Sequence, residues 1–174
     1  MNVKEMIDVE ISIKYDYQLS NKEVNYIFNI YNECFYGNNV NNRGQIDLVK
    51  KWISTYKIFK WYLAKVDNRV VGIAAFVYDY KNVNKFDIRQ DRGVNVTNVA
   101  VLEKYRKLGI AKLLMRTINE EYNKSMDLVV EIKRANTNEF YEILVKFYMS
   151  LGYKELDQDN PVDEPHLYLR LCKE

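Results

Sequence analysis

Proline, glycine, cysteine and histidine are scarce in this chain of 174 residues, which contains 2, 6, 2 and 1 of them, respectively. Both prolines lie near the C-terminus, so they interrupt none of the elements that precede them. Cys34 and Cys172 form neither a CxxC pair nor a metal-ligand pattern, and His166 is the single histidine. These absences argue against a disulfide-rich secreted scaffold or a zinc site, so we expect a reduced protein without a metal.

Long apolar runs and an excess of one charge are also missing. No apolar stretch approaches the ~20 residues that span a bilayer, and the N-terminal residues lack the apolar core of a signal peptide. The chain has 26 basic and 24 acidic residues, a formal net charge of +2. This balance argues against a dedicated nucleic-acid or membrane-surface binder. We therefore expect a soluble, cytoplasmic protein in which any positively charged site is local.

What the chain does contain is apolar sequence. Hydrophobic residues make up 48% of it, enough for the core of a single domain over residues 1–174. Apolar residues that alternate predict strands, and those spaced three or four apart predict helices. The patterns predict, in chain order, a strand at 9–15, helices at 22–36 and 45–58, two strands within 60–80 joined at Asp67 and Asn68, a strand at 94–101, a helix at 109–123, a strand at 128–132, a helix at 136–153 and a last strand at 165–174.

One predicted strand-to-helix turn carries more positive charge than a connection needs. It reads YRKLGIAK at 105–112, with Arg106, Lys107 and Lys112 around Gly109. A helix N-terminus leaves its first amides without partners, and a glycine lets a phosphate approach them. Arginine adds bidentate phosphate contact. The pattern therefore predicts an anion site, with an ordinary basic surface turn as the alternative. Neither a P-loop nor a GxGxxG motif is present.

Two stretches resemble the motifs of a known family, the GCN5-related N-acetyltransferase (GNAT) superfamily. VAVLEKYRKLGIAKLLM (99–115) resembles its acetyl-CoA-binding motif, whose core, Arg/Gln-x-x-Gly-x-Gly/Ala, is residues 106–111 here. VKFYMSLGYKE (145–155) is similar to the family's tyrosine-plus-Leu-Gly-Phe/Tyr signature, with Tyr148 four residues before Gly152. The two motifs stand in the family's order, separated by a strand and a helix.

The resemblance implies a fold and a cofactor site. The fold is α/β (α+β), a GNAT-like mixed, mostly antiparallel central sheet flanked by helices. It is splayed between the strands at 94–101 and 128–132, where acetyl-CoA enters. Asn136 or Asn138 would stand for the asparagine that holds pantetheine, although the family position seven residues before the tyrosine is Tyr141 here. The implied cofactor-binding residues are Val99, Ala100, Val101, Arg106, Lys107, Leu108, Gly109, Ile110, Ala111, Lys112 and Asn138.

The implied reaction is transfer of an acetyl group from acetyl-CoA to a primary amine, by direct attack in a ternary complex. The acceptor is a small-molecule or protein amine, and the protein acts as a monomer or homodimer. Tyr148 is the candidate acid for the departing thiolate, because a thiol has a pKa near ~8.5 and a tyrosine near ~10. We expect its hydroxyl at the edge of a buried helical stripe formed by Phe140, Ile143, Leu144, Phe147 and Leu151. The alternative is an aromatic packing residue.

The general base is harder to assign. Many relatives place a carboxylate on the strand that leads into VAV, whereas this chain has Asn98 there. Asparagine takes no proton but can hold a water that does. Glu131 is the second candidate, since it interrupts an apolar strand. A backbone N–H near Val99–Val101 is the expected oxyanion donor. A turn-facing Asn98 and an edge-facing Glu131 are the structural alternatives.

Two other functions remain open at this point. The missing carboxylate at Asn98 favours a non-catalytic acetyl-CoA-binding module of the same fold. The basic residues of 104–112 could bind nucleic acid, but the near-neutral net charge argues against it. Asp79, Asp87 and Asp91 could attract a cationic amine, or belong to a solvated loop.

Overall fold

A computed structural model provides the structure of the protein and describes residues 7–36, 51, 58–77, 93–122, 127–133, 138–155 and 166–171. Its contacts cluster into two compact units. The first unit comprises Met1–Ala75 and Asn98–Leu114, and the second comprises Phe76–Thr97 and Met115–Glu174. Each unit is described by itself below.

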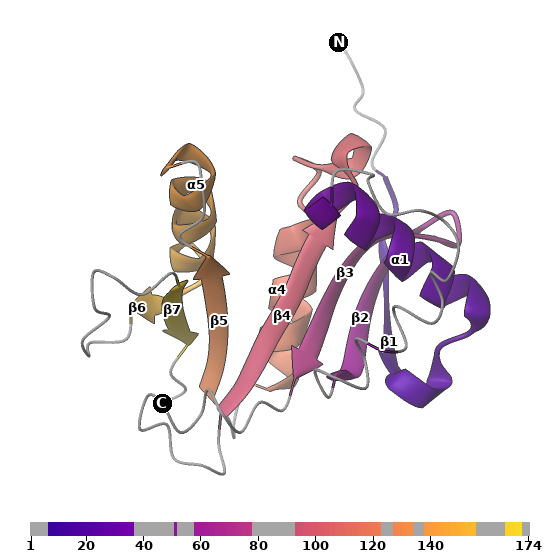
Figure 1. Cartoon of the computed structure of the whole chain (residues 1–174), viewed down its shortest axis with the longest axis horizontal. Coiled ribbons are helices and arrows are strands. Elements are labelled where there is room, and N and C mark those ends of the chain that lie inside the picture. The colour runs from indigo at the N-terminus through magenta and orange to yellow at the C-terminus, as the bar shows by residue number, and fades with distance from the viewer. Residues whose placement is uncertain are drawn as a thin grey trace. The chain divides into compact units, whose positions relative to one another are not determined.

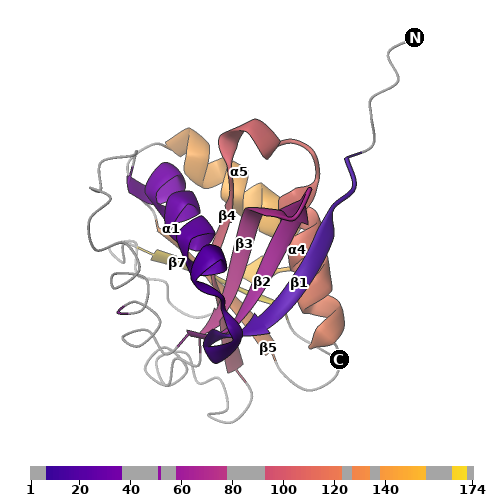
Figure 2. The same ribbon diagram turned by 90° about the vertical axis from the view of Figure 1, so that its right-hand side faces the viewer.

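The first unit is built around three neighbouring strands and a helix. These elements are β1 (Glu10–Tyr15), α1 (Asn21–Tyr36), β2 (Ile58–Val66) and most of β3 (Arg69–Val77), with a 3-10 turn, η1 (Asp16–Gln18), after β1. β1 and β2 are antiparallel, paired from Glu10↔Lys65 to Tyr15↔Lys60. Figure 2 shows the three strands side by side, with α1 across one face of them. Asp67 and Asn68 join β2 to β3 with φ of 49° and 60°, which confirms the predicted turn.

The apolar side of α1 supplies part of the core of this unit. Its buried side chains recur at helical spacing, as the sequence predicts. They are Val24, Ile27, Phe28, Ile30 and Tyr31. Trp61 and Leu63 of β2 are also fully buried.

β4 (Gly93–Val101) runs through both units, which meet in the chain between Thr97 and Asn98. It pairs in parallel with β5 (Asp127–Lys133), from Gly93↔Asp127 to Val96↔Val130, and this ladder ends there. Asn98, two residues later, has a φ of 57°. A positive φ inside a strand bends the chain and interrupts pairing, as in a β-bulge. The parallel ladder that the two strands share therefore stops two residues before the positive φ of Asn98.

The second unit contains the start of β4, then β5, α5 (Asn138–Met149), β6 (Lys154–Glu155) and β7 (His166–Leu171). Its hydrogen-bonded order is β4-β5-β7-β6. β5 and β7 are antiparallel, and so are β6 and β7; Figure 1 shows β5 beside β7. One parallel pair among antiparallel ones confirms the mixed, mostly antiparallel sheet. α4 (Ile110–Glu121) begins in the first unit and ends in the second.

The predicted elements that fall in the described residues are confirmed, with ends that shift by up to four residues. The predicted helix at 45–58 lies outside the described residues except for Lys51, which is helical. The predicted stripe of α5 is wrong at Ile143, which is 56% exposed, and Tyr148, which we expected at its edge, is buried. Leu144, Phe147 and Leu151 are half-buried, and the side chain of Phe140 lies outside the described part of the structure. The buried side of α5 is turned toward Tyr148, because that ring packs against the chain beyond the helix end. None of the described helices is long and apolar enough to cross a membrane.

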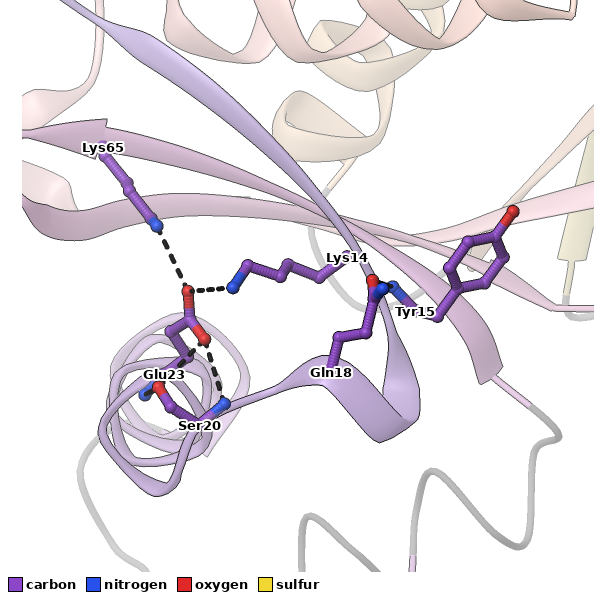
Figure 3. A network of polar contacts seen from close by, with 6 residues as sticks. All are labelled: Lys14, Tyr15, Gln18, Ser20, Glu23 and Lys65. Atoms are coloured by element: carbon purple, nitrogen blue, oxygen red, sulfur yellow. Dashed lines mark hydrogen bonds and ion pairs between the residues drawn. The ribbon is translucent and has the colours of Figure 1, made fainter.

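A buried carboxylate ties α1 to the two strands beside it (Figure 3). Glu23 accepts hydrogen bonds from the Ser20 backbone N–H at 3.0 Å and the Ser20 hydroxyl at 2.9 Å, and its own N–H donates to Ser20 Oγ at 3.2 Å. This is a capping box at the start of α1. Lys65 of β2 and Lys14 of β1 place their Nζ atoms 3.1 and 3.5 Å from Glu23 Oε1. Burial opposes the charge of Glu23, but the bonds from Ser20 and Lys65 outweigh it and lower its pKa from 4.5 to about 2.

This network predicts a pH-dependent stability. Because folded Glu23 binds a proton less readily than the unfolded chain, its charge stabilises the fold above about pH 4.5, and this contribution is lost as the pH falls toward 2. Replacing Glu23 with glutamine should lower the free energy of unfolding by about 2–3 kcal/mol at pH 7, and much less at pH 2.5. Urea denaturation across this range measures the difference. A deficit that stays constant down to pH 2.5 would contradict it.

The backbone at Asn98 generates a second prediction. Asparagine and glycine accept a positive φ, whereas a β-branched residue is strained there. Asn98→Gly should therefore change the free energy of unfolding by less than about 1 kcal/mol, and Asn98→Val should lower it by about 1–3 kcal/mol. Urea denaturation of the two variants measures this. Equal stability of the two variants would show that Asn98 does not need this conformation.

Candidate functional site

A glycine in β3 brings together the end of β4 and the start of α4. A Cβ on Gly72 would lie 3.1 Å from Ile110 Cγ2, 3.2 Å from Val101 Cγ2 and 3.3 Å from the Ala100 carbonyl oxygen. The backbone at the end of β4 is also fixed there, because the Leu102 N–H donates to the Val71 carbonyl oxygen at 3.0 Å. A side chain at this position would be tight, and its neighbours would have to move by a few tenths of an ångström to accept it.

The connection from β4 to α4 contains two residues in the left-handed region. A 3-10 turn, η2 (Glu103–Tyr105), follows the strand, and then Lys107 and Gly109 have φ of 62° and 83°. The Leu113 N–H donates to the Gly109 carbonyl oxygen at 2.9 Å. Gly109 is therefore the N-cap of α4, and the chain enters the helix through two left-handed corners.

This geometry fits a phosphate or pyrophosphate group. The amides at the start of α4 have no acceptor one turn earlier in the helix, and the helix dipole adds positive charge. A Cβ on Gly109 would meet nothing within 4 Å, so the space beside it is open. Lys107 and Lys112 are exposed beside it. Among the described residues, no three His, Cys, Asp or Glu side chains are grouped so as to hold a metal ion.

Arg106 is engaged within the protein. Its Nε donates to the Val101 carbonyl oxygen at 3.0 Å, and its Nη2 lies 3.7 Å from Cys34 Sγ. Its backbone N–H donates to the Glu103 carbonyl oxygen at 3.0 Å. The guanidinium thus holds the end of β4, whereas the sequence favoured a bidentate contact with a phosphate.

Tyr148 stands at the end of α5, where the chain forms a Schellman cap. The Tyr153 N–H donates to the Tyr148 carbonyl oxygen at 3.2 Å, and the Gly152 N–H donates to that of Met149 at 3.0 Å. Gly152 has a φ of 92°, the left-handed conformation that this cap requires. The rings of Tyr148 and Tyr153 touch edge to face, with centroids 5.6 Å apart. The spacing from Tyr148 to Gly152 therefore has a structural cause of its own.

Burial sets the protonation state of Tyr148. The side chain is 8% exposed, and burial raises its pKa above the usual value of a tyrosine. The phenol therefore stays protonated at neutral pH and can donate a hydrogen bond. The neighbouring Tyr153 hydroxyl donates to Asn119 Oδ1 at 3.2 Å.

The other predicted site residues fall into two groups. Ala100 and Val101 are buried and Val99 is half-buried; they share the first unit with the turn of residues 106–111. Tyr148, Glu131 and Asn138 belong to the second unit. Asn98 is half-buried in β4. Glu131 lies in β5 opposite Tyr168 of β7, and Asn138 begins α5. Their side chains lie outside the described part of the structure.

Three residues that contact the turn were not identified from the sequence. Gly72 had a visible signal, since a glycine inside an apolar strand suggests a close approach. Glu33 and Cys34 of α1 had none, because their partners are about seventy residues away in the chain: the Glu103 N–H donates to Glu33 Oε1 at 2.7 Å, and the Cys34 thiol donates to the Val101 carbonyl oxygen at 3.5 Å. Burial raises the pKa of the Cys34 thiol, although Arg106 opposes this, so the thiol stays neutral.

Comparison with known proteins places this geometry in a family. The family model of the acetyltransferase (GNAT) domain matches residues 57–155, more than half of the chain. An N-alpha-acetyltransferase of Sulfurisphaera tokodaii is 29% identical over 102 residues. The aligned part covers 55% of this chain and 57% of that protein, so the chain matches only a little over half of the relative's length.

Solved structures share the fold at low sequence identity. The crystal structure of PH1933 from Pyrococcus horikoshii OT3 has a TM-score of 0.68 and 17% identity, covering 95% of this chain and 99% of that one. The Campylobacter jejuni N-acetyltransferase PseH, solved in complex with acetyl coenzyme A, has a TM-score of 0.59 and 17% identity, covering 95% of this chain and 100% of that one. The family match and the shared fold confirm the resemblance of the two sequence motifs: the chain belongs to the GNAT acetyltransferase family.

Proposed function

We propose that this protein is an acetyl-CoA-dependent N-acetyltransferase that moves an acetyl group to a primary amine by direct attack in a ternary complex. The observation that carries the proposal is the turn at the start of α4. It presents unpartnered helix amides beside the open space at Gly109, inside the region that matches the family model. Acetyl-CoA supplies the acetyl group as a thioester and brings the pyrophosphate that suits such a turn.

The turn would hold the pyrophosphate mainly through backbone groups. The amides of Gly109, Ile110, Ala111 and Lys112 form the first turn of α4, where no earlier helical carbonyl accepts from them. Lys107 and Lys112 add charge from exposed positions. Exposed charges are screened by salt and contribute less than amides held at a fixed geometry.

The end of β4 would bind the pantetheine arm. The ladder with β5 ends at Val96, so the backbone of Val99–Val101 has no partner in the described part of β5. Pantetheine is an extended chain with amide groups, and an open strand edge pairs with such a chain. A backbone N–H in the same segment is our candidate oxyanion donor. We propose that Asn138 makes a further contact to pantetheine.

Tyr148 is our candidate acid for the departing thiolate. Its raised pKa keeps the hydroxyl protonated, which an acid or hydrogen-bond donor requires. Asn98 and Glu131 are the candidates for removing the proton of the amine, Asn98 by holding a water and Glu131 directly. Asn98 takes a positive φ, which aspartate also tolerates. The backbone conformation therefore does not by itself explain why this residue is asparagine and not aspartate. A role of the Asn98 side chain in the reaction is compatible with it.

The relatives suggest two classes of acceptor. The Sulfurisphaera tokodaii relative is an N-alpha-acetyltransferase, which favours the N-terminal amine of a protein or peptide. A structural neighbour with a TM-score of 0.58 is an aminoglycoside 6'-N-acetyltransferase complexed with coenzyme A, which favours a small amine. We propose both classes as acceptors to test. The second candidate function, an acetyl-CoA-binding module without catalysis, is favoured by Asn98 at the position of the family's carboxylate.

Binding of acetyl-CoA to the turn is directly testable by isothermal titration. The wild type should bind, and Lys107→Ala should bind only about two- to threefold more weakly, because one exposed charge contributes little. Gly109→Val should abolish binding, since it fills the open space and strains a residue with a φ of 83°. Gly109→Asn separates these effects, because asparagine tolerates this φ while its side chain fills the space.

Thermal denaturation verifies that each Gly109 variant is folded. If a folded Gly109→Asn or Gly109→Val protein binds acetyl-CoA with normal affinity, the turn around Gly109 is not the binding site, which we call the acetyl-CoA cradle. A wild type that binds no acetyl-CoA at high micromolar concentrations would overturn the proposed function itself.

Catalysis is tested by the release of free thiol from acetyl-CoA across a panel of small amines, polyamines and peptides. Tyr148→Phe keeps the ring contact with Tyr153 but removes the hydroxyl, so kcat should fall by about a hundredfold or more. Because burial raises the pKa of Tyr148, the wild-type rate should show no alkaline decline from this group up to pH 9. Tyr153→Phe makes the same change on the neighbouring ring and should leave kcat unchanged.

Two results would contradict these assignments. If the Tyr148→Phe enzyme has the kcat of wild type, Tyr148 is a packing residue and not the acid. Binding of acetyl-CoA without thiol release for any acceptor would favour the non-catalytic module.

A further inference from the structure

The C-terminal part of α1 contacts the connection between β4 and α4 on the side where it leaves β4. Glu33 Oε1 accepts from the N–H of Glu103, the first residue of η2, at 2.7 Å. The Cys34 thiol donates to the carbonyl oxygen of Val101, the last residue of β4, at 3.5 Å. Arg106 Nη2 lies 3.7 Å from Cys34 Sγ. Two adjacent residues of α1 therefore contact the end of β4, the first residue of η2 and Arg106.

The connection needs support of this kind. It leaves the sheet at Leu102 and enters α4 at Ile110, with left-handed corners at Lys107 and Gly109 between them. A non-glycine residue in the left-handed region costs about 1–2 kcal/mol, so such a turn persists only where its surroundings fix it. The Glu33 carboxylate fixes the start of η2.

Arg106 fixes the other side of η2. Its Nε donates to the Val101 carbonyl oxygen at 3.0 Å, and its backbone N–H donates to the Glu103 carbonyl oxygen at 3.0 Å. Glu103 is thus held at both of its backbone groups: its N–H donates to Glu33, and its carbonyl oxygen accepts from the Arg106 N–H. Glu33, Glu103 and Arg106 form a continuous chain of hydrogen bonds from α1 to the residue before Lys107.

We infer that Glu33 is a positioning residue for the acetyl-CoA cradle, which it holds in place through Glu103 and Arg106. The inference rests on the proposed function, because it assigns the cradle to acetyl-CoA. Glu33 does not touch the ligand in this account. It acts by accepting one backbone hydrogen bond, and this can be separated from the effect of its charge.

The charge and the hydrogen bond predict opposite results. Acetyl-CoA is an anion, so loss of a nearby carboxylate by itself should strengthen binding. Loss of the hydrogen bond should weaken it, by about two- to tenfold for one bond. Glu33→Ala loses both, whereas Glu33→Gln loses the charge and keeps an oxygen acceptor for the Glu103 N–H.

Isothermal titration with acetyl-CoA separates the two. We expect Glu33→Ala to raise Kd by about two- to tenfold and Glu33→Gln to bind as tightly as wild type, or more tightly. Glu120→Ala, which removes an exposed carboxylate from α4, controls for net charge and should not weaken binding. Combining Glu33→Ala with Arg106→Ala should weaken binding by less than the product of the two single effects, because both act through Glu103.

A second measurement keeps the inference independent of the ligand. Amide hydrogen exchange in the free protein should show the Glu103 N–H protected in wild type and Glu33→Gln, and exchanging faster in Glu33→Ala. If wild type binds acetyl-CoA and Glu33→Ala binds equally well, the inference is wrong. If wild type binds no acetyl-CoA, the proposed function fails. Separately, if the Glu103 N–H exchanges at the same rate in Glu33→Ala as in wild type, Glu33 does not hold this turn in place.

Discussion

One backbone constraint organises this protein: β4 pairs with β5 at its start and must leave it before its end. A parallel ladder needs extended backbone, and the positive φ of Asn98 interrupts it two residues after the last pair, Val96↔Val130. Within β4, the residues before Asn98 belong to the second unit and those from Asn98 to Val101 belong to the first. The backbone of Val99–Val101 has no ladder with the described part of β5, and we propose that it binds pantetheine, with the Val101 carbonyl oxygen held by Arg106 and Cys34. A single asparagine thus serves the topology and the proposed site.

The end of the ladder with β5 also affects the turn that follows β4. A strand that has lost one neighbour cannot by itself fix the chain that follows it, and the turn contains two left-handed corners. Its geometry comes from elsewhere: from Gly72, which lets Ile110 approach β3, and from Glu33 and Arg106, which hold η2. Arg106, whose positive charge made the turn conspicuous in the sequence, donates a hydrogen bond within the turn. We propose that the helix amides supply most of the binding of an anion.

The sequence predicted those features of the fold that depend on residues close together in the chain. Alternation, helical spacing and the tolerance of Asn68 for left-handed backbone are local, and the elements they predicted are confirmed. The buried side of α5 was wrong because Tyr148 packs against Tyr153, beyond the helix end. Glu33 was missed because its partner lies seventy residues away. The family's tyrosine signature also has a structural cause, since Tyr148 to Gly152 is the spacing of a helix cap.

That last point bears on how Tyr148 can act. Proton transfer is most efficient between groups of similar pKa, and a thiol has a pKa near ~8.5. Burial moves the pKa of Tyr148 upward, away from that value, and each unit of mismatch costs about 1.4 kcal/mol. The ring of Tyr153 packs against the ring of Tyr148 and contributes to this burial. For the acid role that we propose, the raised pKa of Tyr148 favours donation of a hydrogen bond to the departing thiolate and makes complete transfer of the proton the costlier step.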